Sequence, residues 1–288
     1  MTRTILFFGD SNARGYGVGR ERRYTVLIEA ELRARGESSW RVAFAGASSD
    51  FRVIPARLDA AVAKHQPDIL AWQLPSGPAV YPIRYPSWLR TLRALYNSFF
   101  EWLRERHIRA DIARMGGPDR RPRDEAMFEG LYVASLYRWR PASWPITRHA
   151  NRWLAARYGL AVKATRERYL EIVAHHRERL RAQTGARLLL FGLMPHSDDF
   201  YPGYCARALA WSRDLADLLD RPAEGSHYLD VSPSLVPITA SVVMNDGAHL
   251  AAEGHRRVAA LLLPRLVELM RACEVAGAPE RDAVTLPA

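Results

Sequence analysis

Residues 4–12, TILFFGDSN, place a short apolar run directly before a turn-forming Gly-Asp-Ser-Asn segment. Such a run, bounded by turn residues, is typical of a buried β-strand. A sharp turn at the carboxyl end of a first strand would expose the hydroxyl of Ser11, where an α/β enzyme would place a nucleophile. Glycine and serine are also common turn residues, so this segment alone favours a structural turn.

A second segment, Asp246-Gly247-Ala248-His249, precedes the last predicted helix and contains the two partners that a hydroxyl nucleophile needs. Histidine is the side chain whose pKa suits a general base near neutral pH. An aspartate three residues earlier can reach the other ring nitrogen and orient the imidazole. The alternative is that Asp246 and Gly247 form a turn and that His249 caps the helix.

Apolar periodicity predicts strands that alternate with helices along most of the chain. The predicted strands cover residues 3–8, 41–45, 69–74, 187–193 and 228–231, and the helices cover 24–35, 53–64, 163–183, 203–220 and 251–272. This alternation predicts an α/β fold, a doubly wound three-layer sandwich around a mainly parallel five-stranded sheet. Ligands of such folds bind outside the carboxyl ends of the strands, so we expect the site there.

Residues 79–162 interrupt the alternation and are predicted to be a mostly helical insertion, with helices over 87–107 and 148–159. The net charge of +10 is concentrated between residues 79 and 168. A basic insertion that forms a lid or wall over the site would favour an acidic substrate or an acidic carrier protein. A solvated arginine-rich face explains the charge equally well.

Composition places the 288-residue chain among ordinary globular proteins with a single large domain. No apolar window is long enough to span a membrane and no signal-peptide pattern is present, so we expect a cytoplasmic protein. Cys205 and Cys273 lack metal-ligand spacing and are predicted to be free thiols. Neither a metal nor a cofactor is expected, and residues 274–288 are predicted to be a frayed tail.

Gly9-Asp10-Ser11 and Asp246-x-x-His249 together resemble the two signature blocks of the GDSL, or SGNH, family of serine esterases and lipases. The form Gly-Asp-Ser-Asn is similar to the arylesterase-like branch. The resemblance covers residues 1–78 and 163–272 and implies a flavodoxin-like order of strands. It also implies Ser11 as nucleophile, His249 as general base and Asp246 as its orienting partner.

The family binds the oxyanion with the nucleophile's own N–H, a glycine after the second strand and an asparagine after the third. Ser11 and Gly46 match the first two places, but the third strand is followed by Pro75-Ser76-Gly77-Pro78, without asparagine. The Ser76 hydroxyl or the Gly77 N–H are the nearest replacements. Asn12, Asn97 and Asn151 are more distant alternatives, and a slower or different acyl transfer is another.

Two further polar residues are expected at the carboxyl edge of the sheet, and we predict that Asn12 and His196 contact the substrate. A turn-forming polar loop is the alternative for His196.

The leading hypothesis is therefore a serine hydrolase that cleaves an ester or thioester through a Ser11 acyl-enzyme. A biosynthetic acyltransferase with the same triad is a second possibility. The third is a non-catalytic module whose basic insertion binds an anionic partner. Nucleic acid is the less favoured partner because no recognised binding motif is present.

Overall fold

The computed structural model describes residues 2–15, 18–46, 53–84, 86–88, 91, 95, 144–194, 196–198, 201–239, 241–244 and 247–275, with the backbone alone at 144–148. Within these residues, no helix has the length and apolar character needed to cross a membrane.

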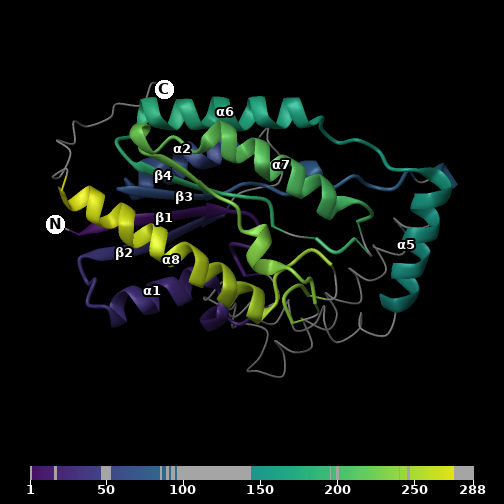
Figure 1. Ribbon diagram of the computed structural model, residues 1–288, viewed down its shortest axis with the longest axis horizontal. Coiled ribbons are helices and arrows are strands. Elements are labelled where there is room, and N and C mark those ends of the chain that lie inside the picture. Colours follow the sequence, from purple (N-terminus) through teal and green to yellow (C-terminus); the bar gives the residue numbers. More distant parts are fainter. Residues whose placement is uncertain are drawn as a thin grey trace, which may run out of the picture.

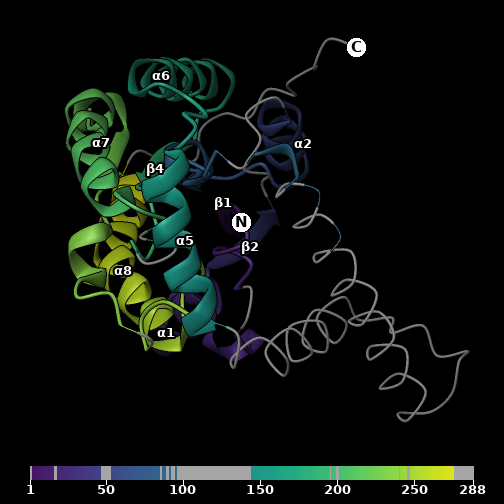
Figure 2. The ribbon, with the colours of Figure 1, turned by 90° about the vertical axis from the view of Figure 1, so that its right-hand side faces the viewer.

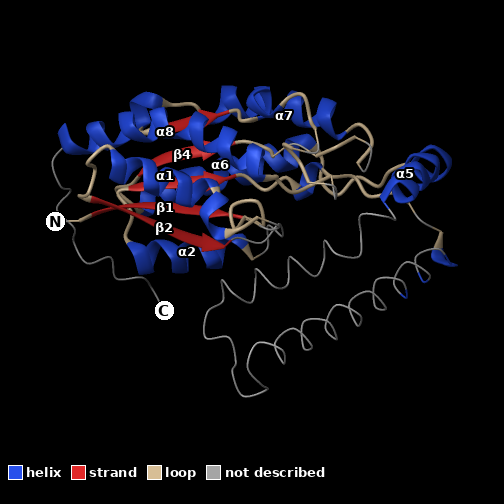
Figure 3. Cartoon of the chain, turned by 90° about the horizontal axis from the view of Figure 1, so that it is seen from below, coloured by secondary structure: helices blue, strands red, loops and turns tan. Residues whose placement is uncertain are grey.

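Five parallel strands form one sheet in the order β2-β1-β3-β4-β5, which is the flavodoxin-like order (Figures 1 and 3). The strands are β1 (Arg3–Gly9), β2 (Trp40–Gly46), β3 (Ile69–Gln73), β4 (Arg187–Phe191) and β5 (Ser226–Leu229). The predicted α/β fold with a parallel five-stranded sheet is confirmed. The carboxyl end of β1 consequently lies between those of β2 and β3.

Helices cover both faces of the sheet, as the alternation of apolar residues in β1 requires (Figure 1). Ile5 and Phe7 pack with α1 (Tyr24–Ala34) and α8 (Ala252–Val275). Leu6 and Phe8 point to the opposite face and pack in the second core, to which α2 (Ile54–His65), α6 (Arg166–Gln183) and α7 (Tyr204–Leu219) contribute. The near-continuous apolar sequence of β1 is therefore a consequence of its burial on both faces of the sheet.

The ends of the predicted insertion meet at one place beside the sheet. Ile83 and Leu160 form an antiparallel bridge, and the main chain on either side adds bonds from Arg84 N to Gly159 O and from Ala161 N to Pro82 O, at 3.0 and 2.7 Å. Between them, α5 (Trp144–Tyr158) lies beyond the carboxyl ends of the strands (Figures 1 and 2). It contains residues 148–158 of the predicted helix 148–159, whereas most of the predicted helix 87–107 lies outside the described residues.

Several predicted boundaries differ from the structure, most clearly at β5, β4 and α8. β5 begins and ends two residues earlier than predicted, because the Asp230 side chain accepts the Ser232 N–H in a turn after the strand. β4 ends at Phe191, two residues before the predicted end. α8 continues to Val275, so the first two residues of the predicted tail are helical, and Glu274 accepts a hydrogen bond from Trp40 Nε1. Residues 276–288 lie outside the described residues.

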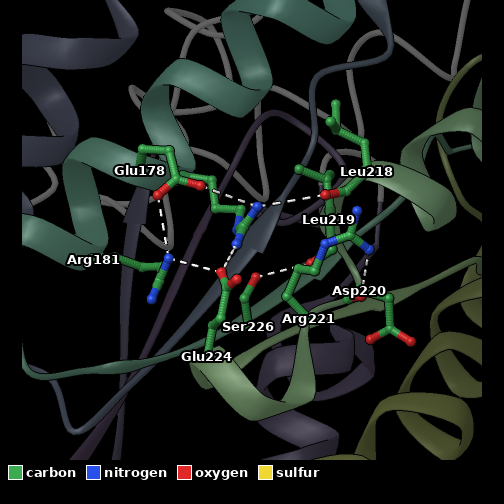
Figure 4. A network of polar contacts seen from close by, with 9 residues as sticks. Glu178, Arg181, Leu218, Leu219, Asp220, Arg221, Glu224 and Ser226 are labelled. Atoms are coloured by element: carbon green, nitrogen blue, oxygen red, sulfur yellow. Dashed lines mark hydrogen bonds and ion pairs between the residues drawn. The ribbon is translucent and has the colours of Figure 1, made fainter.

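A network of ion pairs joins α6 to η4 (Pro222–Glu224), the short 3-10 helix before β5, at the amino ends of β4 and β5 (Figure 4). The Arg177 side chain is 6% exposed and pairs with both Glu178 and Glu224. Arg181 pairs with the same two carboxylates, at 3.2 and 2.7 Å. This network fastens the end of the sheet opposite to Ser11.

Candidate active site

Ser11 lies on a tight turn at the carboxyl end of β1, and Gly9 allows that turn to close. A Cβ at Gly9 would lie 2.6 Å from Ala13 Cβ and 2.9 Å from Gln73 Cβ, so no larger residue fits without displacement. The Asp10 carboxylate spans the turn by accepting the Asn12 N–H at 2.9 Å. Ser11 is thereby held half-buried at the middle of the sheet's carboxyl edge.

His249 reaches Ser11 from a narrow loop before α8. Val243 and Leu250 form an antiparallel bridge, and the Met244 N–H donates to His249 O at 2.7 Å. The Nε2 atom of His249 lies 2.8 Å from Ser11 Oγ. Two residues separated by 238 positions in the sequence are thus brought within hydrogen-bond distance, as the two motifs predicted.

Asn12 holds the main chain on both sides of His249. Its Nδ2 donates to Ala248 O at 3.3 Å, and its Oδ1 accepts the Leu250 N–H at 2.8 Å. The side chain is 3% exposed. The sequence predicted a contact with substrate, whereas the structure places both ends of this carboxamide on the loop that carries the histidine.

Solved structures match nearly the whole chain. TesA is 18% identical with a TM-score of 0.53, and the match covers 93% of this chain and 99% of that one. A lipase/acylhydrolase from Enterococcus faecalis is 14% identical with a TM-score of 0.53, over 94% and 97% of the two chains. A catalytic mutant of Axe2, an acetylxylan esterase from Geobacillus stearothermophilus, is 12% identical with a TM-score of 0.52, over 92% and 95%. This is the fold of the GDSL/SGNH hydrolases.

Sequence comparison adds nothing to that likeness, since no family model and no curated protein matches the chain. Identities this low establish the fold alone. Any activity must therefore be argued from the residues that the GDSL/SGNH fold brings together here.

A series of buried hydrogen bonds runs beneath the turn that carries Ser11. Gln73 Nε2 donates to Asp10 Oδ1 at 2.7 Å, and Tyr24 Oη donates to Gln73 Oε1 at 3.2 Å. The Tyr24 N–H in turn donates to Nδ1 of His255, a fully buried side chain that stacks on the Tyr24 ring. These bonds connect the turn to β3, α1 and α8.

Burial changes the pKa values of two side chains in this series of hydrogen bonds. Burial raises the pKa of the Asp10 carboxyl, although the Asn12 N–H, the Gln73 amide and the nearby His249 act in the opposite direction. Burial also lowers the pKa of His255 to about 3, with Arg23 and His249 adding to the effect. His255 is therefore neutral in the folded protein at physiological pH and can accept the Tyr24 N–H.

Sequence reasoning missed Gln73, Tyr24 and His255. Gln73 carried a usable signal, because it is a polar residue inside the otherwise apolar run 69–74 and must have a partner if that strand is buried. Tyr24 and His255 carried none, since their contacts depend on how α1 and α8 pack.

The predicted oxyanion donors differ in what they contact. Neither the Ser11 N–H nor the Gly77 N–H donates to another residue in the part of the chain that the structure describes. Ser76 is buried, and its Oγ accepts the Met194 N–H at 2.9 Å, while the Tyr204 hydroxyl donates to Met194 O at 2.7 Å. Gly46 ends β2 directly beside Gly9.

Of the four remaining predicted residues, the structure describes His196 and Asn151. His196 is buried, with Nδ1 3.0 Å from Met194 O and its ring against Tyr201 and Tyr204. Asn151 lies on α5. Asp246 and Asn97 lie outside the described residues.

Neither cysteine takes part in a disulfide. Cys205 is half-buried and Cys273 is buried, and both are free thiols, as predicted. The described residues also contain no group of three histidine, cysteine or acidic side chains that could hold a metal ion.

Proposed function

We propose that this protein is a serine hydrolase that cleaves an ester or thioester through an acyl-enzyme on Ser11. The observation that carries the proposal is the 2.8 Å separation of His249 Nε2 and Ser11 Oγ at the carboxyl edge of the sheet. A hydroxyl within hydrogen-bond reach of an imidazole is the arrangement that nucleophilic acyl transfer requires. The lipase/acylhydrolase from Enterococcus faecalis and the acetylxylan esterase Axe2 share the fold that presents this pair.

In the first half-reaction, Ser11 Oγ attacks the carbonyl carbon of the ester while its proton moves to His249 Nε2. The tetrahedral intermediate then collapses, and the alcohol or thiol leaves with that proton. In the second half-reaction, water gives a proton to His249 and attacks the acyl-enzyme. His249 returns its proton to Ser11 Oγ as the carboxylic acid departs. Asp246 is proposed to orient His249, as the sequence resemblance implies.

The oxyanion of each tetrahedral intermediate is proposed to bind the N–H groups of Ser11 and Gly46. Gly77 is the stronger candidate for the third donor, because Gly77 is half-buried, whereas the Ser76 side chain is buried with its Oγ against the Met194 N–H. Loss of one such donor costs about 10²–10³ in rate, so the third donor matters for efficiency. The basic insertion is proposed to form a wall of the substrate site, consistent with the place of α5 beyond the strand ends (Figure 2).

Labelling with a fluorophosphonate probe tests the proposal. The wild-type protein should be labelled, and Ser11→Ala should lose both labelling and at least about 10³-fold of its 4-nitrophenyl acetate hydrolysis. Ser232→Ala is a matched control, because the half-buried Ser232 hydroxyl donates to Leu193 O and not to an imidazole. Equal labelling of wild type and Ser11→Ala would refute the assignment of the nucleophile.

A further inference from the structure

The side chain of Arg14 lies against Gly46, beside the nucleophile turn. A Cβ at Gly46 would stand 2.3 Å from Arg14 Nη2, 2.6 Å from Nε and 2.8 Å from Cζ. The guanidinium therefore occupies the space that a side chain at position 46 would fill. A side chain at position 46 would displace the guanidinium from that place.

The main chain positions this arginine close to Ser11. The Arg14 N–H donates to Asp10 O at 3.1 Å, which makes Arg14 part of the same turn. Gly46 is the register partner of Gly9 in the parallel ladder. Because adjacent strands lie about 4.8 Å apart, this register places the guanidinium beside the turn that carries Ser11.

Within the described residues, Arg14 has no partner that would explain this placement. Its side chain is exposed and makes no hydrogen bond or ion pair with any residue in the described part of the chain. By contrast, many of the other described arginines pair with a carboxylate, as Arg33 and Arg257 do. A guanidinium carries five donors in a planar fork that matches a carboxylate, and here they remain available to a ligand.

We infer that Arg14 is a specificity-determining residue that binds a carboxylate of the substrate next to the scissile bond. The inference rests on the proposed function and narrows it to esters that carry a negative charge. The charged group can belong to the acyl part or to the alcohol part, and both would present the same carboxylate to the guanidinium. The excess of basic over acidic residues, 41 to 31, assists the approach of such substrates.

The test compares charged and neutral esters of matched size. For the acyl part, the pair is 4-nitrophenyl hydrogen succinate and 4-nitrophenyl butyrate. For the alcohol part, the pair is 4-acetoxybenzoate and its methyl ester. In at least one pair, Arg14→Gln should lower the ratio of kcat/KM for the charged over the neutral ester by about 10-fold or more, mainly through KM. Arg14→Lys should restore part of that ratio, and rising salt should weaken the wild-type preference.

Arg213→Gln is the matched control, because Arg213 is an exposed arginine on α7 and its substitution should leave both ratios unchanged. Unchanged ratios in Arg14→Gln would overturn the inference. An equal loss on charged and neutral esters would also overturn it and would identify Arg14 as an oxyanion donor. If none of the four esters is hydrolysed, the same ratio is read from the rates at which a carboxyalkyl fluorophosphonate and its methyl ester inactivate the protein.

Failure of the inference is distinguishable from failure of the proposed function. Turnover or labelling that persists in Ser11→Ala refutes the function itself. Ser11-dependent turnover with a charge preference that ignores Arg14 refutes only the role of this arginine.

Discussion

Asn12 follows Ser11 in sequence, and its carboxamide is turned toward the loop that carries His249. It bonds Ala248 O on one side of His249 and the Leu250 N–H on the other. Because it belongs to the same turn as Ser11, it couples the position of the imidazole to that of the hydroxyl. Asn12 is therefore a positioning residue.

The Asn12→Ala variant should lose activity through kcat. Both main-chain groups lose a buried partner, which we expect to lower the unfolding free energy by about 1–3 kcal/mol. The histidine loop is then less well fixed, and kcat should fall about 10- to 100-fold with KM nearly unchanged. Ester kinetics and urea unfolding measure the two effects.

Ser11→Ala serves as the comparison, since it removes the reactive hydroxyl without unfastening the loop and should retain stability. A raised KM in Asn12→Ala, with normal kcat and stability, would instead indicate that Asn12 contacts the substrate as the sequence predicted.

At the scale of elements, the network around Arg177 fastens α6 and η4 to the sheet. The Arg177 guanidinium is buried, so its carboxylate partners offset the cost of its desolvation. Both partners are partly exposed to solvent, which moderates the contribution of each pair.

The Glu224→Gln variant should lower the unfolding free energy by about 1–3 kcal/mol, because a buried guanidinium loses its charged partner. Glu171→Gln is the control, since the Glu171–Arg168 pair is exposed on the surface of α6 and should contribute at most about 0.5 kcal/mol. Urea titrations compare the two variants. Equal effects would mean that the Arg177 network contributes no more than a surface pair.

Sequence patterns predicted the elements well where apolar periodicity was strong. The strands around β1 and β3 and the core helices agree with the structure, because burial on a sheet imposes those patterns. The short β5 was displaced by two residues, since only four residues and a side-chain turn define it. The contact of Arg14 with Gly46 could not be predicted, because it depends on how the turn after β1 lies against the end of β2.

At the scale of the whole molecule, two buried histidines make stability depend on pH. Burial lowers the pKa of His176 to about 4 and that of His255 to about 3, from an ordinary value of 6.5. As the pH falls below 6.5, the unfolded chain binds protons at these positions while the folded chain does not. Stability is therefore greatest above pH 6.5 and decreases toward pH 4 for His176 and toward pH 3 for His255.

Each histidine should contribute a slope of about 1.4 kcal/mol per pH unit within its window. His255→Asn keeps an acceptor for the Tyr24 N–H and removes the titration, so its unfolding free energy should decrease less steeply between pH 6 and 4.5. Urea unfolding at several pH values measures the slope. A slope equal to that of the wild type would show that His255 is not protonated on unfolding.

The bond between Ser11 and His249 also has a consequence for biogenesis. It joins the first strand of the sheet to the loop before the last helix, so the two halves of the proposed catalytic pair leave the ribosome far apart in time. At about 5–20 residues per second, the interval of 238 residues takes roughly 12–48 s. Throughout that interval the nascent chain carries the serine without its base. The proposed activity can therefore begin only after synthesis has reached the loop that carries His249.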